Sequence, residues 1–287
     1  MNAMNAVNGY AMQDETIRLL LSRLDDLCDR GARGEAGVSP YLTPREAKYA
    51  RVHLSARLRG GTAVLWGGYP EAERVRAVIL PDYTEGLVDP EALAVDPVAA
   101  LAGAGLDDLA DTIREAVCPI SVRGSGFREL THRDYLGSVL GLGLERDAVG
   151  DILLPDAHNA ILMTDTRVGD FLAVSLTKVA TDTVKVGRVP EGTALAGTRR
   201  LQPISDTVAS QRLDSMVAAL CNLSREKAQM AVKAGLCELD YEAVEDCSAT
   251  VDAPAVISVR GYGKFAVHAF DGVTKKGRVR LVAGKYI

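Results

Sequence analysis

The side chains best suited to chemistry in this sequence are basic residues near its C-terminal end. Residues 260–287 contain seven lysines and arginines and a single acidic residue, Asp271, which gives a local charge of +6. Lysine and arginine bind phosphate because neutralising it releases condensed counterions. The segment therefore has the charge expected of a site for a polyanion. A solubilising basic face on a pair of strands would have the same composition, so charge alone leaves both interpretations open.

This positive segment belongs to an otherwise acidic chain. The 287 residues include 33 basic and 38 acidic side chains, a net charge of −5. Residues 1–207 hold 22 basic and 29 acidic side chains, whereas residues 208–287 hold 11 and nine, so the two parts carry −7 and +2. The composition, 47% hydrophobic and 25% charged, is ordinary for a globular protein and excludes disorder, collagen and coiled coil as dominant states.

Two helices are predicted just before the basic segment. Apolar residues recur at i, i+3, i+4 and i+7 from Leu213 to Leu220, which indicates one helix. Ser224 is a suitable N-cap for a second helix that ends at Lys233. Gly235 follows at the position where a left-handed residue commonly ends a helix. The free N–H groups at the start of the second helix would favour a phosphate.

Strands are expected after these helices. Runs of apolar and β-branched residues predict them at Leu236–Leu239, Val256–Arg260 and Phe265–Phe270, with a basic strand or loop at Arg278–Val282. Gly261 and Gly263 allow a close approach of the backbone to a ligand and tolerate positive φ.

This arrangement resembles the αL RNA-binding domain of small-subunit ribosomal protein four. The resemblance spans about 75 residues and departs from the family at Leu239-Asp240 and Pro254-Ala255, both in expected hairpin turns. The motifs that carry it are Arg212–Asp214 (RLD), Leu223–Arg225 (LSR), Ala228, Gly235, Ile257–Gly261 (ISVRG) and Thr274–Arg278 (TKKGR). The resemblance implies an RNA site, with the later basic residues around the same groove as the second helix. The residues expected to form it are Arg212, Ser224, Arg225, Lys227, Lys233, Arg260, Gly261, Gly263, Lys264, Lys275, Lys276 and Arg278.

The region before residue 61 is predicted to be helical. Leucines at helical spacing favour a helix from about residue 14, and a Gly-rich, charged break covers Gly31–Pro40. Thr43, Pro44 and Glu46 then have the spacing of an N-cap, a first-turn proline and a capping box.

The middle of the chain alternates short strands with helices, which predicts an open α/β sheet similar to a ferredoxin-like or RRM domain. Strands are expected at residues 63–66 and 76–80. The acidic stretch 84–117 is expected to be an insertion packed on the surface, with a helix near Leu106–Val117. Further strands are expected at 120–122, 151–154, 160–163 and 183–189, with helices after Thr131 and over Val168–Leu176. Gly187–Thr207 has the composition of a linker. Because the chain has four Phe in all, stacking pairs of the kind by which RRM sheets bind bases are not evident.

Upstream motifs resemble the bacterial YlmH-like family. They are Tyr41–Glu46 (YLTPRE), Trp66–Arg74 (WGGYPEAER), Leu80–Tyr83 (LPDY), Thr131–Gly137 (THRDYLG) and Gly150–Ile152 (GDI). The resemblance implies an α+β protein in three parts: a helical N-terminal segment (1–60), an RRM-like α/β domain (61–205) and an αL RNA-binding domain (206–287). It also implies a non-enzymatic RNA-binding protein, and no cofactor is expected. The N-terminus lacks the basic flank and the apolar stretch of a signal peptide, which predicts a cytoplasmic protein. Its expected partners are rRNA of the large ribosomal subunit and peptidyl-tRNA, in ribosome-associated quality control, with no membrane and no DNA specificity.

Other functions are kept as alternatives. αL domains also occur on pseudouridine synthases, which would make Asp214 a tempting nucleophile, although its place at a helix start is simpler. His132-Arg133-Asp134 mimics a kinase catalytic loop, but Val139 stands where the metal-binding Asn belongs, so a helix cap at Thr131 is favoured. The five cysteines are scattered without CxxC spacing, which favours idle thiols over a metal site. A protein adaptor with an acidic docking surface is the third alternative. The longest apolar run, Pro97–Leu106, is too short to span a bilayer.

Overall fold

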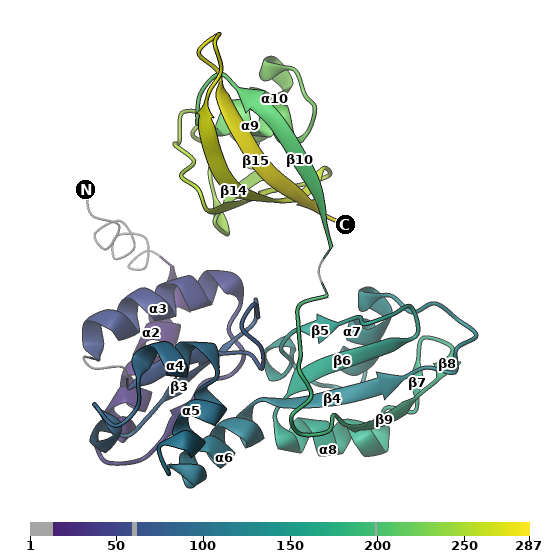
Figure 1. The fold of residues 1–287 in the computed structure, drawn as a ribbon. Coiled ribbons are helices and arrows are strands. Elements are labelled where there is room, and N and C mark those ends of the chain that lie inside the picture. The colour runs from purple at the N-terminus through teal and green to yellow at the C-terminus, as the bar shows by residue number, and fades with distance from the viewer. Residues whose placement is uncertain (1–13, 59–61, 199) are drawn as a thin grey trace. The chain divides into compact units, whose positions relative to one another are not determined.

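The computed structural model describes residues 14–58, 62–198 and 200–287. The chain divides into two compact units, Met1–Thr198 and Arg199–Ile287. The first unit runs from purple to teal in Figure 1 and the second from green to yellow. Helices and strands are mixed in both, so the protein is of the α+β class, as the sequence predicts. The part of the predicted N-terminal segment at residues 1–13 lies outside the described residues.

The N-terminal part of the first unit is a small sheet with helices. Its elements are α2 (Glu15–Gly31), β1 (Gly37–Val38), α3 (Pro44–Arg57), β2 (Ala63–Trp66) and β3 (Arg76–Ile79). Asp14 caps α2, and Thr43 with Glu46 forms the predicted capping box of α3. The strands pair in the order β1-β3-β2. The boundary predicted between residues 60 and 61 therefore separates strands of one sheet, because the two-residue strand β1 is too short to leave a periodic pattern.

Residues 84–117 are part of this core rather than a surface insertion. The segment follows a 3₁₀ turn at Asp82–Thr84 and forms the helices α4 (Pro90–Val95), α5 (Pro97–Gly103) and α6 (Asp107–Ala116). Leu93, Leu101 and Ile113 are buried in one cluster with Val64 of β2 and Val78 of β3. The expectation of a surface insertion is wrong, because the apolar faces of these short helices cover the sheet.

The second part of the first unit is a four-stranded antiparallel sheet with two main helices. Its strands are β4 (Cys118–Arg123), β5 (Ile152–Leu153), β6 (Asn159–Thr164) and β9 (Lys185–Arg188), in the order β5-β6-β4-β9. The remaining elements are α7 (His132–Leu140), a 3₁₀ turn at Arg146–Ala148, α8 (Thr166–Ser175), β7 (Lys178–Val179) and β8 (Asp182–Thr183). The side chain of Asp134 accepts a hydrogen bond from the backbone N–H of Thr131 at 2.9 Å, which confirms the predicted cap on α7.

A buried polar contact joins the two parts of the first unit. The carboxylate of Asp151, just before β5, accepts hydrogen bonds from the hydroxyl of Tyr69 at 2.7 Å and from the backbone N–H groups of Glu73 and Arg74 at 2.8 and 3.2 Å. Next to it, Gly150 leaves no room for a side chain, since a Cβ there would lie 2.6 Å from the ring of Tyr41. The WGGYPEAER and GDI motifs are therefore parts of one junction.

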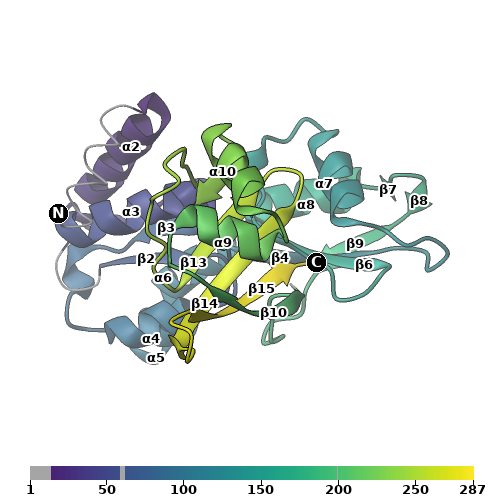
Figure 2. The ribbon, with the colours of Figure 1, turned by 90° about the horizontal axis from the view of Figure 1, so that it is seen from above.

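The C-terminal unit is a six-stranded sheet with α9 (Leu213–Leu220) and α10 (Arg225–Lys233) packed on it (Figure 2). The strand order is β10-β15-β14-β13-β11-β12. The strands are β10 (Leu201–Val208), β11 (Cys237–Leu239), β12 (Glu242–Ala243), β13 (Ala255–Val259), β14 (Gly263–Val273) and β15 (Val279–Tyr286). The linker predicted through Thr207 thus ends earlier, because β10 pairs along its whole length with β15. The predicted domain start at residue 206 falls inside this strand.

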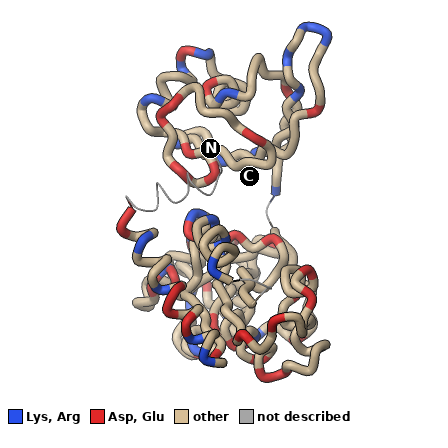
Figure 3. The backbone as a smooth tube through the Cα atoms, turned by 90° about the vertical axis from the view of Figure 1, so that its left-hand side faces the viewer, with Lys and Arg blue, Asp and Glu red and all other residues tan. Residues whose placement is uncertain are grey.

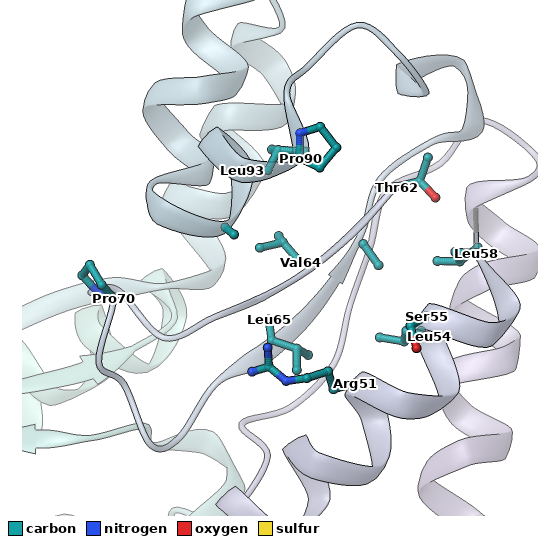
Figure 4. A pocket seen from close by; sticks show the side chains of 12 residues that line it. Arg51, Leu54, Ser55, Leu58, Thr62, Val64, Leu65, Pro70, Pro90 and Leu93 are labelled. Carbon is teal, nitrogen blue, oxygen red and sulfur yellow. The ribbon is translucent and has the colours of Figure 1, made fainter. Parts of the chain in front are cut away.

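A cavity of about 450 Å³ opens between α3, β2 and α4 (Figure 4). Its lining is largely aliphatic, and Arg51, Ser55 and Thr62 supply its polar side chains. Among the described residues, the lining holds no carboxylate, imidazole or thiol that would act as an acid, a base or a nucleophile.

Candidate nucleic-acid interface

The two helices of the C-terminal unit present the first group of predicted site residues. Arg212 is the N-cap residue of α9, and Ser224 caps α10 by accepting a hydrogen bond from the backbone N–H of Lys227 at 3.3 Å. Ser224, Arg225 and Lys227 are all exposed at the start of α10. The free N–H groups at this helix end and the positive end of its dipole favour an anion at the same place.

Asp214 lies beneath this surface and contacts both Arg212 and Arg225. Its side chain is fully buried, and its carboxylate accepts two hydrogen bonds from the guanidinium of Arg212, at 3.1 and 3.2 Å. Gln229 of α10 donates to the same carboxylate at 2.9 Å, and Nε of Arg225 lies 3.8 Å from it. The side chains of Arg212 and Arg225 nevertheless remain 40% and 66% exposed. Both guanidinium groups are thus held from one side and open to solvent on the other.

The electrostatics of Asp214 keep this cluster charged. Burial by itself would raise the pKa of its carboxyl, but hydrogen bonds from Arg212 and Gln229 outweigh burial and lower the pKa. The hydrogen bond to Asp214 in turn raises the pKa of Arg212. From the sequence, Asp214 is expected at a helix start, and its contacts with Arg212 and Gln229 are not predicted. The signal that was available is the i, i+4 spacing of Arg225 and Gln229, which puts both on the face of α10 that meets this carboxylate.

The second group lies at the turn between β14 and β15, which we call the distal hairpin (residues 272–280). Lys275, Lys276, Arg278 and Arg280 are exposed there, and no acidic residue follows Asp271. Arg278 donates from Nε to the hydroxyl of Thr207 at 2.9 Å and from Nη2 to the carbonyl of Thr207. Figure 3 shows Lys and Arg in blue at the tip of this hairpin. The result is a local cationic projection, with one arginine fixed to the neighbouring strand.

The third group lies at the other end of β14. Arg260 and Gly261, which has φ +85°, form the turn between β13 and β14, and Gly263 opens β14 with φ +127°. Lys264 is half-buried, and its ammonium lies 5.1 Å from the ring centre of Tyr241 and 4.9 Å from that of Tyr286. Lys233 ends α10, three residues before Leu236, whose carbonyl accepts from the N–H of Arg260 at 2.9 Å. Lys233 therefore belongs to this end of the unit.

The predicted residues do not surround one groove. Gly263 and Val273 are the two ends of one extended strand, so at about 3.3 Å per residue they lie roughly 30 Å apart. The expectation that the Lys275–Arg278 segment shares a groove with Arg260 and Lys264 is wrong. The length of β14, which includes two register irregularities against β15, could not be predicted from the short apolar run Phe265–Phe270.

The candidate catalytic groups are poorly placed for reaction. Asp214 is buried and its carboxylate is hydrogen-bonded to Arg212. It therefore cannot reach an RNA base, as the pseudouridine-synthase alternative requires. Burial raises the pKa of Cys221 and of Cys237 to about 11, so both are thiols at neutral pH. Within the described residues, no group of three or more His, Cys, Asp or Glu side chains is placed to hold a metal ion.

Comparison with known proteins identifies the family. Residues 17–84 match the family described as "YlmH, N-terminal", and residues 119–192 match "Putative RNA-binding domain in YlmH". The chain is 31% identical over 248 residues to the "Ribosome-associated protein quality control protein P2" of Bacillus subtilis, with 85% of each chain covered. The chain belongs to the YlmH family. The resemblance seen in the sequence motifs is thereby confirmed.

A solved YlmH-family structure provides a further comparison. The structure "Cell division protein ylmH from Streptococcus pneumoniae" is similar to the present chain with a TM-score of 0.46 and 17% sequence identity. The match covers 64% of the present chain and 96% of that chain.

In the part of the present chain that the structure describes, no helix has the length and apolar character needed to cross a bilayer.

Proposed function

We propose that this YlmH-family protein is a non-enzymatic RNA-binding protein of the cytoplasm that docks on structured RNA at the ribosome. Its proposed partners are rRNA of the large subunit and peptidyl-tRNA, in quality control of stalled subunits. Two comparisons support the proposal: the RNA-binding description of the domain matched at residues 119–192, and the ribosome-associated name of the Bacillus subtilis relative.

The observation that carries the proposal is the distal hairpin. It places four exposed basic side chains on one hairpin with no acid among them, in a chain whose net charge is −5. Such a projection gains binding energy from a polyanion through counterion release. The Asp214 cluster and the turn at Arg260 add basic groups at other places on the same unit. Because β14 separates the two turns by roughly 30 Å, we infer an extended, folded RNA as the partner rather than a single phosphate group.

The test is the salt dependence of binding to purified ribosomal subunits. Binding to large subunits carrying peptidyl-tRNA, to small subunits and to whole ribosomes is measured by sedimentation at several salt concentrations. The variant Lys275→Ala/Lys276→Ala/Arg280→Ala removes three basic groups and leaves Arg278 on Thr207. Each lost phosphate contact reduces the slope of log affinity against log salt by about one. We expect weaker binding to large subunits and a slope reduced by about two to three.

A matched control removes the same charge elsewhere. Arg18, Arg23 and Arg33 are exposed on or beside α2, and the triple alanine variant there lowers net charge equally. We expect this variant to retain the wild-type slope. Unchanged affinity and slope for the hairpin variant, or equal losses in both variants, would contradict the proposed docking surface. A modified nucleoside that disappears from RNA of a deletion strain would instead support the enzyme alternative.

A further inference from the structure

Phe127 is an unusually exposed residue in the second part of the first unit. It lies in the loop between β4 and α7 (residues 124–131), and 96% of its surface is exposed. Burying a phenylalanine side chain is worth about 1.5–3 kcal/mol. A ring left in solvent on a well-formed loop therefore needs an explanation.

The loop holds this ring outward instead of letting it collapse. On one side, the N–H of Gly124 donates to the carbonyl of His158 at 2.9 Å, and the N–H of Ser125 donates to the carboxylate of Asp182 at 2.9 Å. On the other side, Nη1 of Arg128 donates to the hydroxyl of Thr181 at 2.7 Å. The next residues anchor the loop further, because the N–H of Leu130 donates to a backbone carbonyl at 2.8 Å and its side chain is buried.

Glycines complete this geometry. Gly126, directly before the ring, has φ +87°, a conformation that other residues rarely adopt. A Cβ at Gly124 would lie 2.7 Å from the carbonyl oxygen of His158 and 2.9 Å from the carboxylate of Asp182. Both flanks of the loop are thus fixed, and the ring is displayed at a defined position.

The base of the loop carries exposed basic groups. Arg123, the last residue of β4, pairs across the sheet with Lys185 of β9, and both side chains are exposed. Asp182, by contrast, is buried against Ser125, so its charge is turned into the loop. Glu129 is the exposed acid of the loop itself.

A single ring is a poor hydrophobic interface but a good stacking surface. The other exposed large apolar side chains of this part of the unit, Phe171 and Val174, lie on α8 and not on the loop. An exposed aromatic ring on a loop whose base carries exposed basic groups has the chemistry that binds unpaired nucleobases, since every base offers a π-face and a neighbouring phosphate.

We propose that Phe127 is a stacking platform for an unpaired RNA base, with Arg123 and Lys185 contacting the adjoining phosphates. The proposal rests on the proposed function in taking RNA as the partner. It assigns to the second part of the first unit an RNA contact of its own, in addition to those of the C-terminal unit. The loop binds an unpaired base, whereas the distal hairpin binds the phosphates of the RNA backbone.

The experiment compares two naked RNAs: a hairpin with an unpaired loop, and a fully paired duplex of the same length. Stacking of a base on an aromatic ring contributes about 1–3 kcal/mol, which corresponds to roughly 5- to 150-fold in affinity. We expect Phe127→Ala to weaken binding of the hairpin RNA by a factor in this range while the salt slope stays unchanged. Duplex affinity should not change. Phe127→Trp should retain hairpin binding, and its indole fluorescence should be quenched by that RNA. Phe171→Ala is the matched control, and we expect it to bind both RNAs as the wild type does.

The outcomes separate this proposal from the proposed function. Wild-type binding that Phe127→Ala leaves unchanged overturns the stacking proposal alone. Equal losses for hairpin and duplex RNA overturn base recognition. A loss confined to whole ribosomal subunits overturns it in favour of a protein contact. If the wild-type protein binds neither RNA, the stacking proposal fails, whereas the proposed function is decided separately by sedimentation with ribosomal subunits. Thermal melting of the variant should match the wild type, because the ring makes almost no buried contact.

Discussion

Replacing Asp214 with asparagine tests whether the buried carboxylate holds the two arginines of the α9–α10 face. The substitution Asp214→Asn keeps the size of the side chain and removes its charge. In the wild-type protein the carboxylate accepts two hydrogen bonds from Arg212, one from Gln229 and one from the backbone N–H of Ser215. The amide of asparagine retains one acceptor oxygen, and its NH₂ group faces donors. The variant therefore loses at least one charged hydrogen-bonded pair.

The size of the effect follows from these contacts. A hydrogen bond to a charged group contributes about 1.5–3 kcal/mol. Arg212 is partly exposed and regains water when released, so we expect a loss of roughly 2–3 kcal/mol at neutral pH. Because the pKa of Asp214 is lowered in the folded protein, its contribution is present above the unfolded pKa of about 3.9 and is lost as pH falls through the lower folded value. The difference between wild type and variant should therefore shrink in strong acid.

Hydrogen exchange of the full chain, followed by mass spectrometry, measures this change locally. Peptides covering residues 212–233 should exchange roughly 30- to 160-fold faster in the variant, which is the expected free energy converted at 1.36 kcal/mol per factor of ten. Peptides from α7 and α8 in the first unit serve as an internal reference. Asp252→Asn, at an exposed acid of the same unit, is the matched control. Unchanged exchange in α9 and α10, or a loss that persists fully below pH 3, would refute the assigned role of Asp214.

Three further variants test other contacts. Thr131→Ala removes the N-cap of α7, and at about 1 kcal/mol it should lower the melting temperature of the first unit by roughly 2–4 °C in calorimetry. Gly150→Ala forces a Cβ to 2.6 Å from the ring of Tyr41, and urea unfolding should show a loss of about 1–3 kcal/mol, whereas wild-type stability would argue against a tight junction. Lys264→Met removes the ammonium that lies over two tyrosine rings, so it should cost about 0.5–2 kcal/mol in urea unfolding and reduce the salt slope of RNA binding less than Lys275→Ala does.

Sequence reasoning predicted the features that depend on local chemistry. The capping box at Thr43, the helix cap at Thr131 and the helices α9 and α10 follow from residue types three or four positions apart, and each is present. Pairings between distant segments were missed. β1 is a strand because of β3, and the burial of Leu93 and Leu101 depends on a sheet formed elsewhere in the chain.

The candidate site shows the same division. The basic residue types and their gathering near the C-terminal end were visible in the sequence, because charge is counted along the chain. Their separation was hidden, since it depends on the register of β14 and β15 across two irregularities. The role of Asp214 required the crossing of α9 and α10, and the display of Phe127 required the anchors at Asp182 and Thr181.

The pairing of β10 with β15 has a practical consequence. The first strand of the C-terminal unit lies beside its last, and the N–H of Ile287 donates to the carbonyl of Arg200 at 3.1 Å. The entry and exit points of this unit are therefore neighbours, an arrangement that tolerates circular permutation and transplantation between proteins. A purification tag fused after Ile287 would emerge next to Arg200 at the start of this unit, whereas a permuted chain opened at a distant turn would leave that edge of the sheet uncovered.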